Sequence, residues 1–145
     1  MPTQAAPGTV VLDTNVVLDL LLFADPSVHE LELALAARQL LWVGTAAMRE
    51  EFVRVLAYPQ IDRQIATRAR SPAALVQEFD RLSHLTAAVP TVPVRCRDSD
   101  DQMFVDLAVA HAASLWSRDQ HVVRLRRRLA ALGVAVVLPV RPVAA

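Results

Sequence analysis

The stretch VVLDTNV occupies residues 10–16, and its aliphatic side chains stop abruptly at Asp13. A short run rich in β-branched residues is typical of a buried strand, so we predict a strand over residues 9–12. The apolar side chains that follow have helical spacing. Asp13 is therefore expected at a strand-to-helix junction, at the carboxyl end of the strand.

Short apolar runs continue to alternate with amphipathic segments along the chain. Strand patterns recur over residues 41–43, 114–117 and 134–138. Helical spacing predicts helices over residues 16–23, 28–40, 46–58, 61–70, 71–88, 99–112 and 121–132. Residues 89–95 contain two prolines and are expected to be extended. This alternation predicts an α/β fold, specifically a three-layer α/β/α sandwich around a mostly parallel sheet.

Length and composition favour one domain. The chain has 145 residues, of which 54% are hydrophobic, so we expect a single domain over 1–145 with its core at about 9–138 and a frayed tail at 139–145. The longest apolar runs have about five residues, whereas a membrane span needs roughly 18. The first residues lack the positive segment of a signal peptide, and the single cysteine, Cys96, excludes an internal disulfide. We expect a cytoplasmic protein without membrane association.

Charge and glycine content exclude several classes of function. Fifteen basic residues balance fifteen acidic ones, and every basic residue is an arginine. Without lysine, the chain lacks the group needed for Schiff bases, for a P-loop, and for phosphatases of the haloacid dehalogenase type or receiver domains. The three glycines, at positions 8, 44 and 133, form no nucleotide-binding loop. Zero net charge provides no global field that would attract nucleic acid.

Acidic side chains are predicted to converge at the carboxyl edge of the sheet, where open parallel sheets bind ligands. Asp13 ends the first strand, and Asp119 follows the strand at 114–117. Each has an ordinary alternative role as the cap of a helix or turn. At about 100° per residue, Glu51 projects to the edge of its helix's apolar stripe, whereas Glu50 projects to solvent, within reach of Arg54. The alternative for Glu51 is a boundary residue whose stem covers the core.

The helix over residues 99–112 carries a further acid. Asp101 projects to its buried face near the N-terminus, where Ser99 and Gln102 fit a capping box. Asp106 projects to solvent and is discarded. A buried carboxylate at a helix start needs a partner, and a cation is the obvious one.

The candidate set therefore comprises four carboxylates, those of Asp13, Glu51, Asp101 and Asp119. The negative charges of four carboxylates in a small volume repel one another unless protons or a divalent cation neutralise them. Oxygen donors alone suit Mg²⁺ or Mn²⁺ rather than zinc. Asp98 and Asp100 are assigned capping or supporting roles. A hard cation held by carboxylates is the usual equipment for phosphodiester hydrolysis.

Four segments stand in order: VVLDTNV at 10–16, EFVRVL at 51–56, CRDSDDQMF at 96–104 followed by Ala108, and SRD at 117–119. Together they resemble the acidic motifs of the PIN-domain nucleases, a family that includes the VapC-like toxins of bacterial toxin–antitoxin pairs. The resemblance covers about residues 9–138. Ala108, seven residues after Asp101, identifies Asp101 as the third acid, while Asp98 and Asp100 depart from the simplest pattern.

The resemblance implies a metal-dependent endoribonuclease in which the four acids hold one or two Mg²⁺ or Mn²⁺ ions. A metal-activated water would attack phosphorus in line, with Asn15 and Ser117 orienting the carboxylates or the water. The resemblance also implies RNA as substrate, a toxin role, a cognate antitoxin and a homodimer. The alternative is a catalytically inactive PIN-fold binding module.

Arginines follow the fourth acid. Arg118, Arg124 and Arg127 are candidate contacts to the RNA backbone beside the metal site. Leucines form the apolar stripe of the same predicted helix, so a solvated arginine face is the ordinary alternative. His111 is expected to be a half-buried packing residue.

Overall fold

The computed structural model describes residues 8–140. Its centre is one five-stranded sheet with the order β3-β2-β1-β4-β5, in which every neighbouring pair of strands is parallel. The strands are β1 (Gly8–Leu12), β2 (Leu40–Gly44), β3 (Ser83–Leu85), β4 (Ser114–Trp116) and β5 (Val136–Val137). The predicted α/β architecture with a parallel sheet is confirmed.

Helices connect the successive strands, because parallel neighbours need a crossover. The α-helices within residues 8–140 are α1 (Thr14–Leu18), α2 (His29–Ala36), α3 (Ala46–Leu56), α4 (Pro59–Thr67), α5 (Pro72–Leu82), α6 (Gln102–His111), α7 (Gln120–Val123) and α8 (Arg126–Ala130). Three shorter elements complete the set: the π-helical turn η1 (Asp19–Phe23) and the 3₁₀ turns η2 (Pro26–Val28) and η3 (Ser99–Asp101). Every helix in this range is too short or too polar to span a bilayer.

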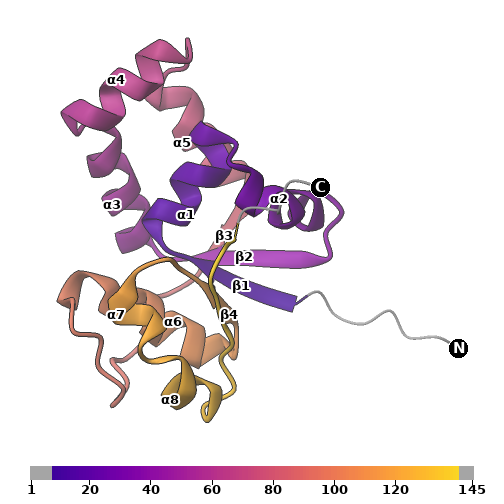
Figure 1. Ribbon diagram of the computed structural model, residues 1–145, viewed down its shortest axis with the longest axis vertical. Coiled ribbons are helices and arrows are strands. Elements are labelled where there is room, and N and C mark those ends of the chain that lie inside the picture. The colour runs from indigo at the N-terminus through magenta and orange to yellow at the C-terminus, as the bar shows by residue number, and fades with distance from the viewer. Residues whose placement is uncertain (1–7, 141–145) are drawn as a thin grey trace, which may run out of the picture.

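The helices form two layers, one on each face of the sheet. Helices α1 to α5 lie on one face, and α6, α7 and α8 lie on the other (Figure 1). Alternate residues of β1 divide between two cores, because side chains alternate along a strand. Val10 and Leu12 pack with the first group of helices, and Val11 packs with the second. The three layers match the predicted sandwich.

Aromatic side chains lock α3 and α5 onto the first face. Trp42 of β2 meets Phe79 of α5 edge-on, with ring centroids 4.9 Å apart, and Phe52 of α3 stacks on Phe79 at 5.1 Å. All three side chains are buried. Because α3 also carries Glu51, this aromatic contact sets the position of one predicted site residue relative to the sheet.

Polar caps begin three helices directly after strands β1, β2 and β4. The backbone N–H of Val16 donates to Asp13 Oδ1 at 2.9 Å, and that of His121 donates to Asp119 Oδ1 at 2.8 Å. Thr45 Oγ1 accepts from the N–H of Met48 at 3.4 Å. Since the strands are parallel, these helix starts share one edge of the sheet. Two of the predicted acids, Asp13 and Asp119, therefore lie at helix N-termini.

One strand was missed. The helix predicted over 71–88 ends at Leu82, and Ser83–Leu85 forms the edge strand β3 beside β2. The Ser83 hydroxyl donates to the carbonyl of Phe79 at 2.6 Å, while its backbone is extended. Pairing with β2 thus overrides a helical pattern that is continuous in the sequence.

Other predicted elements are shorter or divided. The helix predicted over 28–40 ends at Ala36, and the one predicted over 121–132 is two helices, α7 and α8. The strand predicted over 134–138 is only Val136–Val137. The segment 16–23 changes from α-helix to the π turn η1, and Ala24 ends it with a left-handed φ of 47°. Of the predicted frayed tail, residues 141–145 lie outside the described range.

A polar network holds the extended segment before α6, and it corrects the prediction for Asp106. This residue is 6% exposed rather than solvated, and its Oδ1 accepts from the Val92 N–H at 3.0 Å and from Gln102 Nε2 at 2.9 Å. Gln102 Oε1 accepts from the Cys96 N–H at 2.6 Å, so Gln102 forms no capping box with Ser99. A helical projection omits this segment, which folds over α6. His111 is exposed, not half-buried.

Candidate metal centre

Three carboxylates meet at the carboxyl edge of the sheet. Asp98, Asp101 and Asp119 each offer one oxygen, and these oxygens lie within 4.8 Å of one another. Asp98 precedes the turn η3 and Asp101 ends it, whereas Asp119 follows β4 and begins α7. Oxygens around one Mg²⁺ or Ca²⁺ lie about 2.0–2.6 Å from the ion, so three oxygens at this spacing fit a shared cation.

Asp101 is the least satisfied member of this acidic cluster. Its Oδ2 is buried and has no hydrogen-bond partner among the described residues. Burial first, and then the carboxylates of Asp119, Asp98 and Asp13, raise the pKa of Asp101 to about 8. A buried carboxylate oxygen without a partner is costly, and a divalent cation would relieve the repulsion between the acids and supply the missing contact. This orphaned oxygen therefore fits a metal ligand.

Asp13 lies beside the cluster and is held by two donors. It is 4% exposed, and it accepts hydrogen bonds from the Val16 N–H and the Ser117 hydroxyl. Burial raises the pKa of Asp13, although these two donors act in the opposite direction. Ser117 is fully buried, and its Oγ also accepts from the N–H of Asp119 at 3.0 Å. One hydroxyl thus joins the ends of β1 and β4.

Glu51 lies on another wall of the site. The Thr14 hydroxyl donates to Glu51 Oε2 at 2.5 Å, which ties α3 to the start of α1. The structure does not bring Glu51 into the group of three oxygens. Glu51 is half-buried, as expected for the edge of an apolar stripe.

A cavity of about 280 Å³ opens over these groups. All four predicted acids line it, together with Asn15. The wall also includes Thr14, Tyr58 and Gln60, which the sequence analysis missed. Thr14 lies inside the first motif, so its hydroxyl could have been considered there. Tyr58 and Gln60 flank Pro59, the first residue of α4. The sequence signal that could have identified this wall is an aromatic residue directly before a proline that begins a helix.

Asp98 and Asp100 lie in different surroundings in the structure. Asp98 caps the turn η3, accepting from the Asp100 N–H at 3.0 Å, and it also belongs to the acidic cluster. Asp100 is exposed and lies in a neighbouring hollow. Of the predicted supporting pair, Asp98 therefore lies inside the acidic cluster and Asp100 lies outside it.

The candidate RNA-binding arginines differ in their surroundings. The Arg118 guanidinium pairs with Asp19, donates to the Ser27 hydroxyl and lies 3.9 Å from Asp25. Arg118 is therefore engaged within the protein, across η1 and η2. Arg124 and Arg127 are exposed, beyond the start of α7.

A sequence profile described as the PIN domain matches residues 9–121, which include all the acids of the cluster and its walls. A search of curated proteins returned no match. PIN domains are generally metal-dependent nucleases, which agrees with the grouping of Asp98, Asp101 and Asp119. The chain belongs to the PIN domain family.

Proposed function

We propose that this protein is an endoribonuclease that requires a divalent cation and hydrolyses phosphodiester bonds in RNA. The observation that carries the proposal is the buried, unpartnered Oδ2 of Asp101 within a group of three converging carboxylates. Membership of a family of metal-dependent nucleases supports the same reading.

The donor set favours Mg²⁺ or Mn²⁺, because only oxygens converge. Asp101, Asp119 and Asp98 would hold the cation, and Asp13 and Glu51 would bind its water ligands or a second ion from the walls of the cavity. When bound, the cation lowers the pKa of a water molecule and stabilises negative charge on phosphate oxygens.

The protein's own groups keep these carboxylates in fixed positions. The Ser117 hydroxyl holds Asp13, and the Thr14 hydroxyl holds Glu51, so neither acid needs to reorganise when a substrate arrives. Asn15, exposed on the cavity wall, is placed to orient a water molecule or a phosphate oxygen. Preorganised donors and charges of this kind lower the cost of reaching the transition state.

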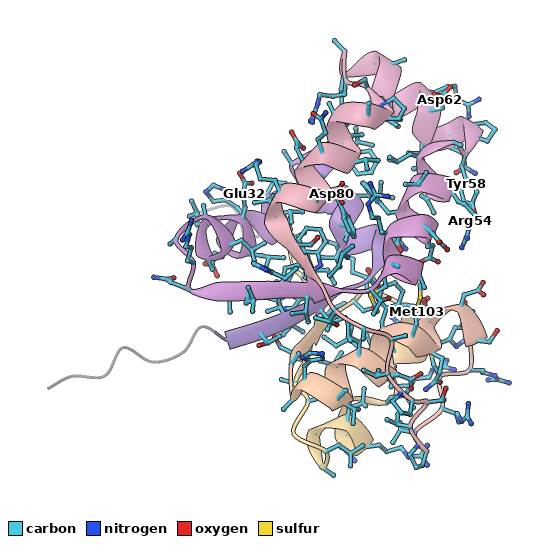
Figure 2. The ribbon with its side chains drawn as sticks, turned by 180° about the vertical axis from the view of Figure 1, so that it is seen from behind. Glu32, Arg54, Tyr58, Asp62, Asp80 and Met103 are labelled. Atoms are coloured by element: carbon cyan, nitrogen blue, oxygen red, sulfur yellow. The ribbon has the colours of Figure 1, made fainter. Side chains whose placement is uncertain are left out.

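Cleavage of labelled RNA tests the proposal. Metal-stripped protein is incubated with 5′-labelled single-stranded and hairpin RNAs, with and without Mg²⁺ or Mn²⁺. We expect cleavage only with metal, products with a 5′-phosphate, and a loss of at least about 100-fold in Asp101→Asn and Glu51→Gln. Glu32→Gln is the matched control, because Glu32 is exposed on α2, away from the acidic cavity (Figure 2).

Metal titration of the same variants separates the alternatives. Wild-type protein that binds the cation yet cleaves none of the RNAs would favour the inactive binding module. Equal cleavage by wild type and Asp101→Asn would reveal a contaminating nuclease and contradict the proposal. Failure of the wild type to bind any divalent cation would overturn the assignment of the cluster.

We further propose that the nuclease is the cytoplasmic toxin of a toxin–antitoxin pair, acting as a homodimer and neutralised by a cognate antitoxin. The motifs that resemble VapC-like toxins support this role. Induced expression of the wild type should arrest bacterial growth, while Asp101→Asn should not. Light scattering of the purified protein tests the dimer, and absence of growth arrest by an active nuclease would contradict the toxin role.

A further inference from the structure

A second hollow adjoins the acidic cavity. Its volume is about 450 Å³, and it shares Glu51 and Tyr58 with the cavity. We call it the Tyr58 hollow; it is lined by Ala47, Glu50, Glu51, Arg54, Tyr58, Ser99, Asp100 and Met103. Figure 2 shows Tyr58 and Arg54 on the arm formed by α3 and α4, with Met103 below them on α6. Any chain that crosses the acidic cavity can therefore continue into this hollow.

Tyr58 presents its ring from a fixed backbone. Its N–H donates to the Val55 carbonyl at 3.0 Å, and its carbonyl accepts from the N–H groups of Ile61 and Asp62 at 2.9 and 2.8 Å. Pro59 follows as the first residue of α4, which restricts the junction further. The side chain is nevertheless 52% exposed. A rigidly held, exposed aromatic beside a nuclease centre has the properties of a stacking platform for a base.

The charges of the hollow favour a base over a phosphate. Three carboxylates, those of Glu50, Glu51 and Asp100, line it against one guanidinium, that of Arg54. Carboxylates repel a phosphate, but they accept hydrogen bonds from the amino and imino groups of bases. The Arg54 guanidinium forms no hydrogen bond or ion pair with any residue in the range 8–140, not even the Glu50 expected from the sequence. Its planar guanidinium is therefore available to a second face of the base.

We propose that the Tyr58 hollow binds a nucleobase of the RNA strand, adjacent to the phosphate held at the acidic cavity. The base stacks on Tyr58, and a carboxylate of Asp100 or Glu50 accepts a hydrogen bond from its exocyclic amino group. Adenine, cytosine and guanine carry such a group, whereas uracil offers a carboxylate only its imino N3–H between two carbonyl oxygens, so the hollow selects against uracil at this position. This inference rests on the proposed nuclease function and adds a determinant of sequence preference to it.

Binding and cleavage of short RNAs test the inference. Fluorescein-labelled single-stranded 12-mers that differ in one base beside the cut are titrated with Mn²⁺ into the uncleavable Asp101→Asn background, and cleavage is then measured with Mn²⁺ in proteins that keep Asp101. We expect Tyr58→Ala to weaken binding and raise KM by about 5- to 100-fold with little change in kcat. Tyr58→Phe should retain most of the affinity, because it keeps the ring. Leu33→Ala removes an equally exposed apolar side chain elsewhere and is the control.

Two further measurements sharpen the result. Photocrosslinking with a 4-thiouridine or 6-thioguanosine placed beside the cut should join the RNA to Tyr58, which is the only tyrosine in the chain. Asp100→Asn, which exchanges an acceptor oxygen for a donor amide, should reduce the preference against uracil.

The outcomes separate this inference from the proposed function. If the wild type cleaves RNA with metal while Tyr58→Ala keeps the wild-type KM, the inference is wrong and the nuclease stands. If the wild type binds RNA but cleaves none, and Tyr58→Ala binds RNA more weakly than the wild type, the hollow is a base site and the nuclease proposal fails. If Tyr58→Ala leaves RNA binding unchanged and weakens only the binding of a protein partner, the nucleobase assignment is overturned.

Discussion

At Asp101, burial and neighbouring charge act in the same direction, which makes the metal-free protein sensitive to pH. The pKa of Asp101 is about 8 in the folded protein, against 3.8 as the ordinary value. Between these values the folded state holds a proton that the unfolded state has released. Stability from this group is therefore fully present below about pH 4 and is lost as the pH rises toward 8.

The melting temperature in EDTA should accordingly fall between about pH 5 and pH 8.5. Asp101→Asn should flatten this decline, because an amide does not titrate. Added Mn²⁺ should stabilise the wild type more at pH 8 than at pH 5, since protons and cation compete for the same oxygens. A wild-type profile identical to that of Asp101→Asn in EDTA would contradict the assigned environment. Differential scanning calorimetry gives both comparisons.

Ser117 makes the second prediction at the scale of a residue. Its buried hydroxyl donates to Asp13 and accepts from the Asp119 N–H, so Ser117→Ala leaves a buried carboxylate and a backbone donor short of partners. We expect a loss of about 1–3 kcal/mol in the free energy of unfolding, measured with urea. Metal affinity should also fall, because Asp13 loses its orientation.

Ser114→Ala, at the start of β4 and three residues before Ser117, is the matched control. The Ser114 side chain makes no hydrogen bond with the residues from 8 to 140, so its removal should change stability by no more than about 0.5 kcal/mol. Equal effects of the two substitutions would show that the Ser117 hydroxyl has no special role.

Residue positions at the site were predictable to the extent that strand ends determine them. Asp13 and Asp119 follow β1 and β4, which are direct neighbours in the sheet, so their approach follows from topology. Asp98 joins the cluster through the conformation of the turn η3, which no helical or strand period describes. Asp106 was misplaced because the segment that covers it has no regular structure. Helical and strand periodicity does not predict the long-range contacts that irregular segments make.

At the scale of the elements, Arg118 joins the π turn η1 to the end of β4. Its guanidinium pairs with Asp19 and contacts Ser27, and the side chain is 34% exposed against 15% for Asp19. Arg118→Met leaves Asp19 and Asp25 without this cation, and we expect a loss of about 1–3 kcal/mol in urea unfolding. Because Arg118 lies between Ser117 and Asp119, metal affinity should fall as well.

Arg49→Met is the corresponding control. Arg49 forms a bidentate pair with Asp80 at 2.8 and 2.9 Å, but both side chains are more than a third exposed. Exposed pairs contribute at most about 1 kcal/mol, so this substitution should have the smaller effect. If Arg118→Met weakens RNA binding without any loss of stability, Arg118 is a substrate contact rather than a clamp between elements.

The elements themselves were predictable where local signals agreed with tertiary contacts. The starts of α3 and α5 were predicted to within one residue, and the structure caps these helices with the side chains of Thr45 and Ser71. The strand β3 could not be predicted, because Ser83–Leu85 owes its conformation to pairing with β2. The π turn η1 ends at Ala24 in a left-handed conformation that nothing in the local sequence demands.

At the scale of the whole molecule, charges of one sign gather locally although the net charge is zero. Net charge is zero, yet carboxylates gather at the carboxyl edge of the sheet, where they would repel RNA in the absence of a cation. Arg124 and Arg127 follow Asp119 in the chain, on exposed positions in the turn after α7 and in α8. Arg38 and Arg81 instead precede β2 and β3 in the chain, and neither lines the acidic cavity. RNA affinity should depend on the first pair of arginines and not on the second.

The salt dependence of RNA binding tests this arrangement. Each phosphate neutralised on a single strand contributes about 0.7 to the slope of log Kd against log salt concentration. The double variant Arg124→Gln/Arg127→Gln should reduce the slope by about 1.4, measured by fluorescence anisotropy with Mn²⁺ and the uncleavable Asp101→Asn background. Arg38→Gln/Arg81→Gln removes the same net charge from outside the acidic cavity and should leave the slope unchanged. The two double variants have the same net charge and differ only in which arginines they lack. Contacts to phosphates depend on the position of an arginine, so equal slopes would mean that the arginines after Asp119 form only a solvated face.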